Sequence, residues 1–340
     1  MTEWDRNDPA SYDAAARGTA ELEVSGTDII GPVVRDGLTS TPKTLPPFLF
    51  YDAVGSGLFE KITKLPEYYP TRVERSILES RAGEIARMAI SHAGRNVSVL
   101  ELGAGSATKT QVLLRALVAE QGATTFLPAD VSGAALDAAE SRLARELPEV
   151  KVHPLLAAHP QALAAGRERD DALLVVFLGS SLGNYDEHSA IELLADIRAT
   201  LGPTGSLLLG TDAVKPLDVL LPAYDDSKGV TASFNKNVLA RINRELGGGF
   251  DLDRFGHVAV WNEELSRIEM HLESSVDQVV PIDDLGLEVA FEAKERIHTE
   301  SSYKYDTARL DRMFSQAGLA RECEFYDPEH WFRLTMARPA

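Results

Sequence analysis

The sequence predicts a doubly wound α/β fold, and three observations indicate it. Short apolar runs alternate with longer amphipathic segments from Val97 to Asp212. A glycine-rich turn follows the first of these runs and precedes a helical segment. The runs show no polar face, which is typical of parallel strands covered by helices on both sides. We therefore expect an open parallel sheet with helices between its strands.

The expected core elements follow one another in alternation. Strands are expected at residues 97–102, 125–130, 150–152, 172–179 and 206–212, and helices at residues 108–121, 134–146 and 188–201. Residues 322–339 are typical of a hairpin, which would return to the edge of the parallel sheet.

The alternation ends after Asp212. Residues 232–246 are typical of a helix, three glycines follow, and residues 257–282 then show the pattern of antiparallel strands with acidic turns. This pattern predicts a mixed α+β subdomain inserted at residues 213–302. The core would then comprise residues 97–212 and 303–340, preceded by a helical segment at 41–96. Residues 1–40 are poorly predicted, and the first twenty are small and polar enough to be poorly ordered.

Composition restricts the partners and the location of the protein. Lysine and arginine number 34 against 52 acidic residues, giving a formal net charge of −18. Such a charge repels phosphate backbones and anionic lipid, so neither nucleic acid nor a membrane is expected as a partner. The single cysteine, Cys323, cannot form an internal disulfide, the N-terminus lacks the pattern of a signal peptide, and the longest apolar run is too short to span a bilayer. We expect a cytoplasmic protein and, because no apolar stripe for assembly is visible, a monomer.

The first chemical motif is the turn that runs from Glu101 to Lys109. Gly103 and Gly105 permit a backbone turn tight enough to press against a ligand, and the helix that follows offers unpaired N–H groups. Thr108 occupies the place of a third glycine, which makes the turn less suited to a pyrophosphate. Glu101 suits a cation or a hydroxyl-rich ligand, and S-adenosylmethionine carries an ammonium and a sulfonium with no phosphate. The alternative is a tight turn without a ligand.

Two nearby charged residues are each open to two interpretations. Asp130 ends the second strand, where a carboxylate can accept both hydroxyls of a ribose, but it also precedes a helix that it could cap. Lys109 either meets a ligand carboxylate or faces water.

Another polar turn, at residues 177–184, follows the fourth strand. Strand ends of an open sheet converge on the reacting centre, and Ser180, Ser181 and Asn184 there suit the binding of an amino acid. The turn also matches Gly-x-Ser-x-Gly, with Ser181 as the serine, so an α/β hydrolase is a rival hypothesis. No acid and histidine in the order of an esterase follow it.

Several long blocks of the sequence resemble one enzyme family. They read PKTLPPFLFYDAVGSGLFEKITKLPEYYPTR, ELGAGSATKT, FLGSSLGN, AYDDSKGVTASFNKNVLARINREL, WNEELSRIEM and TESSYKY, and they run in collinear order from about Thr41 to the C-terminus. These blocks are similar to the ergothioneine-pathway L-histidine N-alpha-methyltransferases. The resemblance implies a Rossmann-like class I methyltransferase that uses S-adenosylmethionine. It also implies three methyl transfers to histidine, giving hercynine in the first step of ergothioneine biosynthesis.

The resemblance implies a role for the aromatic segment that precedes the core. Residues 41–96 would form a lid, in which Tyr51 lies against the cofactor while Phe59 and Tyr68 close the amino-acid pocket. Aromatic faces exclude water and stabilise the positive charge of a quaternary ammonium. Tyr68 could also steer the lone pair of the amine, which makes it a candidate catalytic residue. The alternative is a core-packing arm, the expected fate of Phe48, Phe50 and Tyr69.

The residues that bind the amino-acid substrate in the family have counterparts in the core and in the inserted subdomain of this chain. The resemblance implies that Asn184 and Tyr224 hold the carboxylate of the substrate and that Gly179 and Ser181 line the same pocket; Asn184 is the second candidate catalytic residue.

The imidazole ring would be held by residues near the end of the inserted subdomain. The resemblance implies that Glu300 and Ser302 bind the ring and that Met270 packs against it. Without the resemblance, Glu300 and Tyr224 would be ordinary surface or hydrogen-bonded residues.

The chain departs from the family's pattern at the adenine site. Where the family shows Gly-Asp-Phe, this sequence has Ala157, Ala158 and His159. Ala158 cannot accept the hydrogen bond of the adenine amino group, and His159 could partly replace the lost aromatic stacking. His153 and His159 are spaced like metal ligands, but no cluster joins them, so no metal is expected. Two alternatives stay open: an N-methyltransferase for another free amino acid, such as tryptophan or a histidine derivative, and a catalytically idle S-adenosylmethionine-binding protein.

Overall fold

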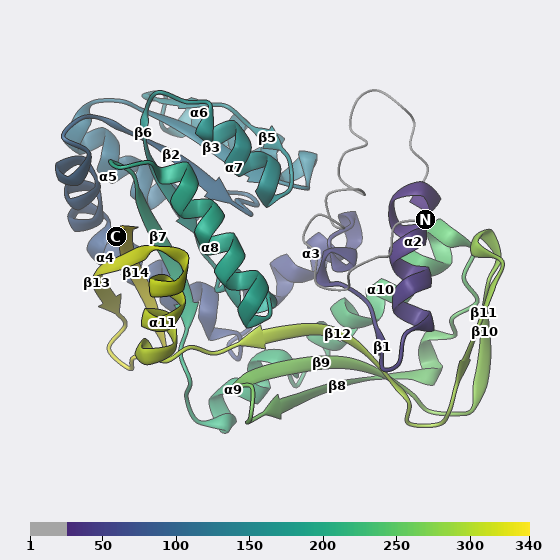
Figure 1. Ribbon diagram of the computed structural model, residues 1–340. Coiled ribbons are helices and arrows are strands. Elements are labelled where there is room, and N and C mark those ends of the chain that lie inside the picture. The colour runs from purple at the N-terminus through teal and green to yellow at the C-terminus, as the bar shows by residue number, and fades with distance from the viewer. Residues whose placement is uncertain (1–25) are drawn as a thin grey trace. The chain divides into compact units, whose positions relative to one another are not determined.

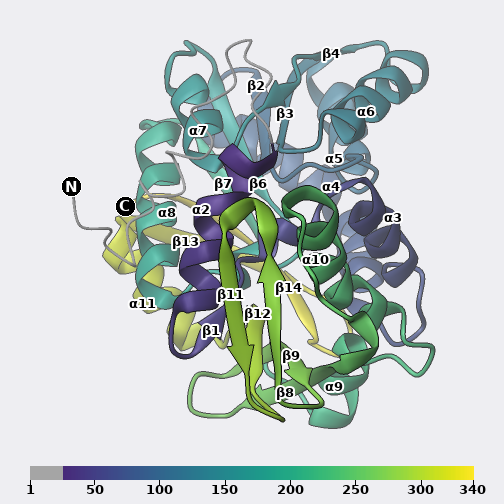
Figure 2. The same ribbon diagram turned by 90° about the vertical axis from the view of Figure 1, so that its right-hand side faces the viewer.

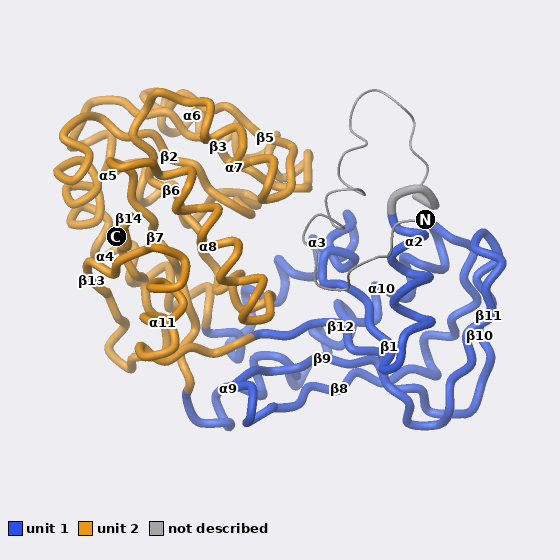
Figure 3. The backbone as a smooth tube through the Cα atoms, viewed as in Figure 1, with its two compact units in different colours: residues 1–69, 215–302 blue, residues 70–214, 303–340 orange. Residues whose placement is uncertain are grey.

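The computed structural model describes residues 26–340, which form two compact units (Figures 1 and 3). Unit 1 comprises residues up to 69 together with 215–302, and unit 2 comprises residues 70–214 and 303–340. The segment 41–96, expected as one lid, is thus divided between the units. The expectation of a poorly ordered N-terminus falls on residues outside those described.

Unit 2 contains a sheet whose strands run in the order β13-β14-β7-β6-β2-β3-β4, with β5 (Leu155–Leu156) pairing with β3. The pairs formed among β2, β3, β4, β6 and β7 are parallel, while β14 is antiparallel to both β7 and β13. The expected C-terminal hairpin at the sheet edge is confirmed. The strands are β2 (Val97–Leu102), β3 (Thr124–Asp130), β4 (Val150–Val152), β6 (Ala172–Phe177), β7 (Ser206–Asp212), β13 (Leu319–Tyr326) and β14 (Phe332–Pro339).

Helices cover both faces of this sheet, which explains why its strands are apolar throughout. One core cluster joins the sheet to α4 (Tyr69–Ala93), α5 (Thr110–Gln121) and α6 (Gly133–Glu146). The other joins it to α7 (His159–Arg167), α8 (Glu187–Leu201) and α11 (Thr307–Ala317). Neighbouring residues such as Val99 and Leu100 belong to opposite clusters, as the alternation of a strand requires. The predicted doubly wound core is confirmed.

Helix α5 begins at Thr110, two residues later than expected. Ala107 has a φ of +51°, in the left-handed region, and residues 108 and 109 form the turn that joins it to the right-handed helix.

Unit 1 contains a sheet of order β1-β12-β9-β8 and a separate hairpin of β10 and β11 (Figure 2). Antiparallel pairing of β8 with β9 confirms the sequence prediction, whereas β10 pairs with β11 and not with β9. The strands are β1 (Lys43–Thr44), β8 (Phe255–Asn262), β9 (Arg267–Ser274), β10 (Gln278–Ile282), β11 (Leu287–Phe291) and β12 (Arg296–Tyr303). The helices are α2 (Gly26–Thr39), α3 (Ala53–Ile62), α9 (Leu217–Tyr224) and α10 (Val230–Leu246), with a short 3-10 turn, η1 (Pro47–Phe50).

Helix α10 has well-defined ends. The carboxylate of Asp226 accepts backbone N–H groups from Lys228, Val230 and Thr231, so the helix begins two residues before the predicted start. It ends at Leu246, and the C-cap residue Gly247 has a φ of +62°. Within residues 26–340, no helix has the length and apolar character needed to cross a membrane.

Candidate active site

The glycine turn after β2 has the conformation that the sequence predicts. Gly103 and Gly105 both have positive φ, +67° and +51°. A Cβ built at Gly105 would meet no atom within 4 Å, so space is open above the turn. Asp130 Oδ2 accepts the Gly105 N–H at 2.8 Å and Oδ1 accepts the Ser132 N–H at 2.9 Å. Ser132, and not Asp130, is the N-cap of α6. Asp130 thus fixes the turn, and each of its oxygens keeps a lone pair for a ribose hydroxyl.

Glu101 is a buried carboxylate with one unpaired oxygen. The side chain projects from β2, accepts the Thr110 hydroxyl through Oε1 and leaves the buried Oε2 without a hydrogen-bond partner. Burial raises the pKa of Glu101 to about 8, although the Thr110 hydrogen bond and the charge of Lys109 oppose this rise. A buried, unpaired acceptor costs free energy unless a donor reaches it. The site therefore fits the ammonium group of S-adenosylmethionine.

His159 lies beside the same turn. Its Nε2 is 3.8 Å from the position of a Cβ at Gly103, and its Nδ1 is 2.9 Å from the Tyr185 hydroxyl. Phe177 contacts the ring edge-on, with centroids 5.2 Å apart. Burial lowers the pKa of His159 to about 4, so the ring is neutral near pH 7. Ala158 is the N-cap residue of α7 and forms no side-chain cap.

The side chains of two consecutive residues, Ser180 and Ser181, form hydrogen bonds that fix the turn after β6. Gly179 and Ser180 both have positive φ, +77° and +58°. Ser180 Oγ accepts the N–H of Asp212 at 3.0 Å, and the Ser181 hydroxyl donates to the Leu178 carbonyl at 2.9 Å. Ser181 is therefore not paired with a histidine base, and the hydrolase hypothesis has no support from this geometry.

Asn184 ends this turn, in the 3-10 segment η2 (Ser181–Asn184). Tyr305 donates its hydroxyl to the Leu182 carbonyl at 3.2 Å, and a Cβ at Gly183 would lie 2.9 Å from the Tyr303 carbonyl oxygen. Asn184 itself is half-buried, and its side chain has no hydrogen-bond partner among the described residues. Its amide is thus held in place on a rigid turn and available to a ligand.

Glu74, which sequence reasoning missed, connects the two turns of unit 2. This residue of α4 is fully buried; its Oε1 accepts the Gly179 N–H at 2.7 Å, and its Oε2 forms an ion pair with Lys109. Lys109 therefore does not simply face water. Glu74 precedes Ile77 and Leu78 by three and four residues, so a carboxylate on the apolar stripe of a helix was the available signal.

In unit 1 the aromatic residues form a chain of ring contacts. The Phe59 ring lies 5.8 Å from that of Tyr51 and 6.2 Å from that of Tyr68, in edge-to-face geometry. Phe234 of α10, which the sequence did not single out, contacts both Tyr51 and Phe59 at 5.8 and 5.9 Å. Tyr51, Phe59 and Tyr68 are only half-buried, whereas Phe50 and Tyr69 are core residues; Phe48 is half-buried.

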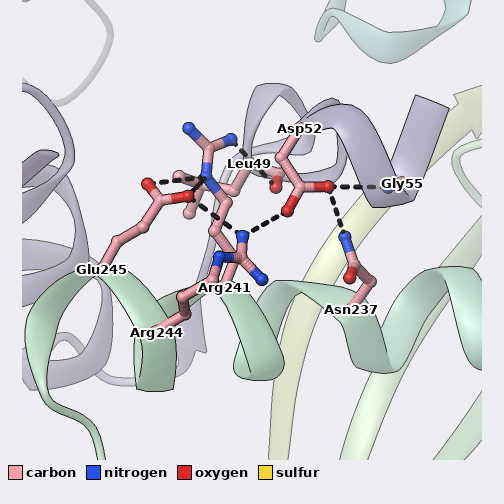
Figure 4. A network of polar contacts seen from close by, with 7 residues as sticks. All are labelled: Leu49, Asp52, Gly55, Asn237, Arg241, Arg244 and Glu245. Carbon is pink, nitrogen blue, oxygen red and sulfur yellow. Dashed lines mark hydrogen bonds and ion pairs between the residues drawn. The ribbon is translucent and has the colours of Figure 1, made fainter.

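A polar network attaches this aromatic segment to α10 (Figure 4). Asp52, the N-cap of α3, accepts the Gly55 N–H at 2.6 Å and the Asn237 amide at 2.9 Å through Oδ1, and its Oδ2 pairs with Arg244. Burial alone would raise the pKa of Asp52, but these three donors together hold it below its ordinary value. The neighbouring Arg241 donates to the Leu49 carbonyl at 3.2 Å.

Tyr224, expected to hold the carboxylate of the substrate, is in direct contact with Ser302, expected to hold the imidazole. The hydroxyls of Tyr224 and Ser302 lie 2.8 Å apart, both buried, and the Tyr224 carbonyl accepts from His257 Nε2 at 2.8 Å. Of the two roles expected for Tyr224 without the resemblance, a surface residue or a hydrogen-bonded one, the structure shows the second.

Strand β12 is irregular where Glu300 lies. His298 Nε2 and Ser301 Oγ are 3.0 Å apart, although side chains three positions apart in a regular strand point to opposite faces. Glu300 is half-buried within this stretch. Met270 of β9 is buried, and its carbonyl accepts the Thr299 hydroxyl at 3.0 Å.

A parallel sheet that ends in a glycine turn, with an unpaired buried carboxylate beside it, places the protein in the class of Rossmann-like S-adenosylmethionine methyltransferases. Comparison with known proteins then gives the family. The model of the histidine-specific, S-adenosylmethionine-dependent methyltransferases matches residues 30–339, and the chain belongs to that family.

Three relatives show the range of similarity. The histidine N-alpha-methyltransferase of Mycolicibacterium smegmatis is 44% identical over 308 residues, covering 89% of this chain and 93% of that protein. Ergothioneine biosynthesis protein 1 of Neurospora crassa is 31% identical over 303 residues, covering 86% of this chain and 33% of that protein. The L-tryptophan methyltransferase of Psilocybe serbica is 27% identical over 347 residues, covering 95% of this chain and 96% of that protein.

Proposed function

We propose that this enzyme methylates the α-amino nitrogen of L-histidine three times and so produces hercynine, the first step of ergothioneine biosynthesis. The observation that carries the proposal is the family match over residues 30–339, together with 44% identity to a histidine N-alpha-methyltransferase over nearly its full length. The substrate is thus a small amino acid. A cytoplasmic location, a monomeric state, and the absence of nucleic-acid and membrane partners stay predictions from the sequence.

We assign cofactor binding mainly to unit 2. The unpaired Oε2 of Glu101 would accept from the ammonium group, Asp130 from the ribose hydroxyls, and Lys109 would meet the carboxylate. Gly103 and Gly105 leave the open space that close approach requires. When bound, S-adenosylmethionine supplies an electrophilic methyl group on a sulfonium.

Three further residues are proposed to contact the cofactor. Tyr51 of unit 1 would lie against it, while Ala158 and His159 would replace the family's usual adenine contacts. A neutral His159 ring adds an aromatic face without placing a second positive charge beside the sulfonium.

We assign the amino-acid acceptor to polar groups at its two ends. The unpaired Asn184 amide and the Tyr224 hydroxyl would hold the carboxylate, with Gly179 and Ser181 lining that part of the pocket. Glu300 and Ser302 would hold the imidazole, and Met270 would pack against the ring. A site that pairs both ends of a zwitterion rejects analogues, because they would leave buried polar groups unpaired.

These residues must align the amine with the methyl group and allow the methylated ammonium to lose its proton. The neutral α-amine must point its lone pair at the methyl carbon, in line with the bond that breaks, and we assign this orientation to Asn184 and Tyr68. Each of the first two transfers leaves an ammonium that must lose a proton before the next, and we assign that proton to water next to the Tyr68 hydroxyl. The faces of Phe59 and Tyr68 would stabilise the cation.

Mass spectrometry of the purified protein with S-adenosylmethionine and all common amino acids in competition tests the proposal. We expect histidine alone to gain one, two and three methyl groups. The tryptophan-named relative, which matches 95% of this chain, makes methylation of tryptophan the second candidate outcome. Tight cofactor binding without any methylated product would identify an idle binding protein.

A further inference from the structure

The buried carboxylate of Glu74 lies at the junction of three chain segments in unit 2. Its Oε1 accepts the Gly179 N–H at 2.7 Å, at the start of the turn that carries Asn184. Its Oε2 pairs with Lys109, the residue that precedes α5 and ends the glycine turn. No part of Glu74 is exposed to solvent.

The third segment, strand β7, is shaped around this carboxylate. A Cβ at Gly210 would overlap Glu74 Oε1, so only glycine leaves room for the contact with Gly179. Gly210 has no positive φ, and its lack of a side chain is therefore needed for space and not for backbone conformation. Three separated positions are thus matched to one buried carboxylate.

The contact also fixes a positive charge. Lys109 is about a quarter exposed, and a Cβ at Gly179 would lie 3.7 Å from its Nζ. An ammonium has three donors, so Lys109 can pair with Glu74 and still present N–H groups to a ligand. Lys109 and Glu74 both act electrostatically on Glu101 of the same turn. Without Glu74, the Lys109 ammonium would lose the partner that holds it beside Gly179.

We propose that Glu74 is a positioning residue for methyl transfer, one that sets the cofactor turn through Lys109 and the acceptor turn through the Gly179 N–H at the same time. The proposal rests on the proposed function only for the identity of the acceptor. Its effect on cofactor binding is independent of which amino acid is methylated.

Two substitutions separate the two contacts. Glu74→Gln keeps an amide oxygen for the Gly179 N–H but turns an NH₂ group towards the Lys109 ammonium, so it breaks the ion pair alone. Gly210→Ala keeps the ion-pairing charge but displaces Oε1 from Gly179. Glu79→Gln is the matched control, because Glu79 lies on the same helix and pairs only with the exposed Arg75.

Two measurements test the proposal. Calorimetry gives the affinity for S-adenosylhomocysteine, and steady-state kinetics are measured with the amino acid that the wild-type enzyme methylates. We expect Glu74→Gln to weaken S-adenosylhomocysteine binding by about tenfold, as for loss of one positioned contact. We expect Gly210→Ala to lower kcat by about 100-fold, since a misplacement near 1 Å has that effect. Lys109→Met should reduce the effect of Glu74→Gln to under about threefold, because a residue that acts through Lys109 has nothing to act on in its absence.

The outcomes distinguish this proposal from the proposed function. If the wild type methylates another amino acid, that acceptor replaces histidine and the comparison of variants stands. If Glu74→Gln and Gly210→Ala both melt at lower temperature but bind and turn over as Glu79→Gln does, Glu74 is only structural and the proposal is wrong. If Glu74→Gln does not fold, Gly210→Ala decides alone: unchanged kcat overturns the proposal.

Discussion

Units 1 and 2 hold their site residues by different physical means. In unit 2 the site residues lie on short turns at strand ends, and buried carboxylates bond to the backbone N–H groups of those turns: Asp130 to Gly105 and Glu74 to Gly179. In unit 1 the site residues are supported by contacts between side chains, as where Asp52 meets Asn237 and Arg244 (Figure 4).

The difference bears on the roles that we propose for individual site residues. Backbone turns with positive φ allow a ligand to approach closely, as we propose for the cofactor at Gly103 and Gly105 and for the amino acid at Gly179. Side chains such as Phe59, Tyr224 and Glu300 can be replaced by other side chains without a change in the backbone. We expect such positions to determine which amino acid is selected. We therefore expect substitution of Gly105 to reduce cofactor binding and substitution of Glu300 to reduce the turnover of histidine.

The largest expected effect is on substrate selection by unit 1. Glu300→Gln should lower kcat/KM for histidine by about 100-fold, or about 2.7 kcal/mol, because the charge-assisted hydrogen bond that we propose to the ring N–H would become a neutral one. Binding of S-adenosylhomocysteine should not change. Steady-state kinetics and calorimetry check this, with the exposed Glu288→Gln as control. Equal losses in both assays would show that the division of roles is wrong.

A smaller effect is expected on cofactor binding by unit 2. Gly105→Ala should weaken S-adenosylhomocysteine binding by about tenfold or more, because its methyl group would occupy the open space above the turn. Gly94→Ala is the matched control, since Gly94 also has positive φ, +63°, and open space around it. Both variants carry a backbone strain of about 1–2 kcal/mol. Equal binding by the two would contradict the placement of the cofactor.

Next in size is the stability of the aromatic segment. Asp52→Ala should lower the free energy of unfolding by about 1–2 kcal/mol, because it removes the N-cap of α3 and the partners of Asn237 and Arg244. Asn237→Ala should add less in the Asp52→Ala background than alone, since the two share a contact. Denaturant unfolding measures both, with the exposed Asp36→Ala as control. Full additivity would show that Asp52 and Asn237 act independently.

The smallest expected effect is the release of a proton from Glu101 when the cofactor binds. Because the pKa of Glu101 is raised to about 8 from 4.5, the free protein keeps this carboxyl neutral at pH 7. Its contribution to stability is full below about pH 4.5, falls as the pH rises towards 8, and is level above. An ammonium ligand favours the carboxylate, so binding should release up to one proton at pH 7 and strengthen as the pH rises to about 8.

Calorimetry in two buffers of different ionisation enthalpy measures that proton. The nearby charges are Lys109, which lowers the pKa of Glu101, and Glu74 and Asp130, which raise it. Glu101→Gln should abolish the release. Release that persists in this variant would assign the proton to another group.

The sequence predicted unit 2 better than unit 1, for physical reasons. Residues 97–212 repeat a local strand-and-helix pattern, and the spacing of Glu101, Gly103 and Asp130 carries their chemistry. The start of α5 was wrong because nothing in the sequence announces a left-handed Ala107. Glu74 was missed because it lies far from both turns in sequence, on the buried stripe of α4.

In unit 1 only the resemblance to a family indicated the site residues. The contact of Tyr224 with Ser302 joins residues 78 positions apart, and no periodicity predicts it. The support of Tyr51 and Phe59 by Phe234 likewise depends on how α10 packs. The irregular stretch around Glu300 could not be predicted, because the residues of β12 have an ordinary strand composition.

The central claim is that the α-nitrogen of histidine is the atom methylated, three times. NMR spectroscopy of the product formed with ¹³C-methyl-labelled S-adenosylmethionine tests it most directly. We predict one methyl resonance of three equivalent groups, correlated through bonds with the histidine Cα. A methyl resonance correlated with the imidazole carbons, or a labelled product from an amino acid other than histidine, would contradict the account.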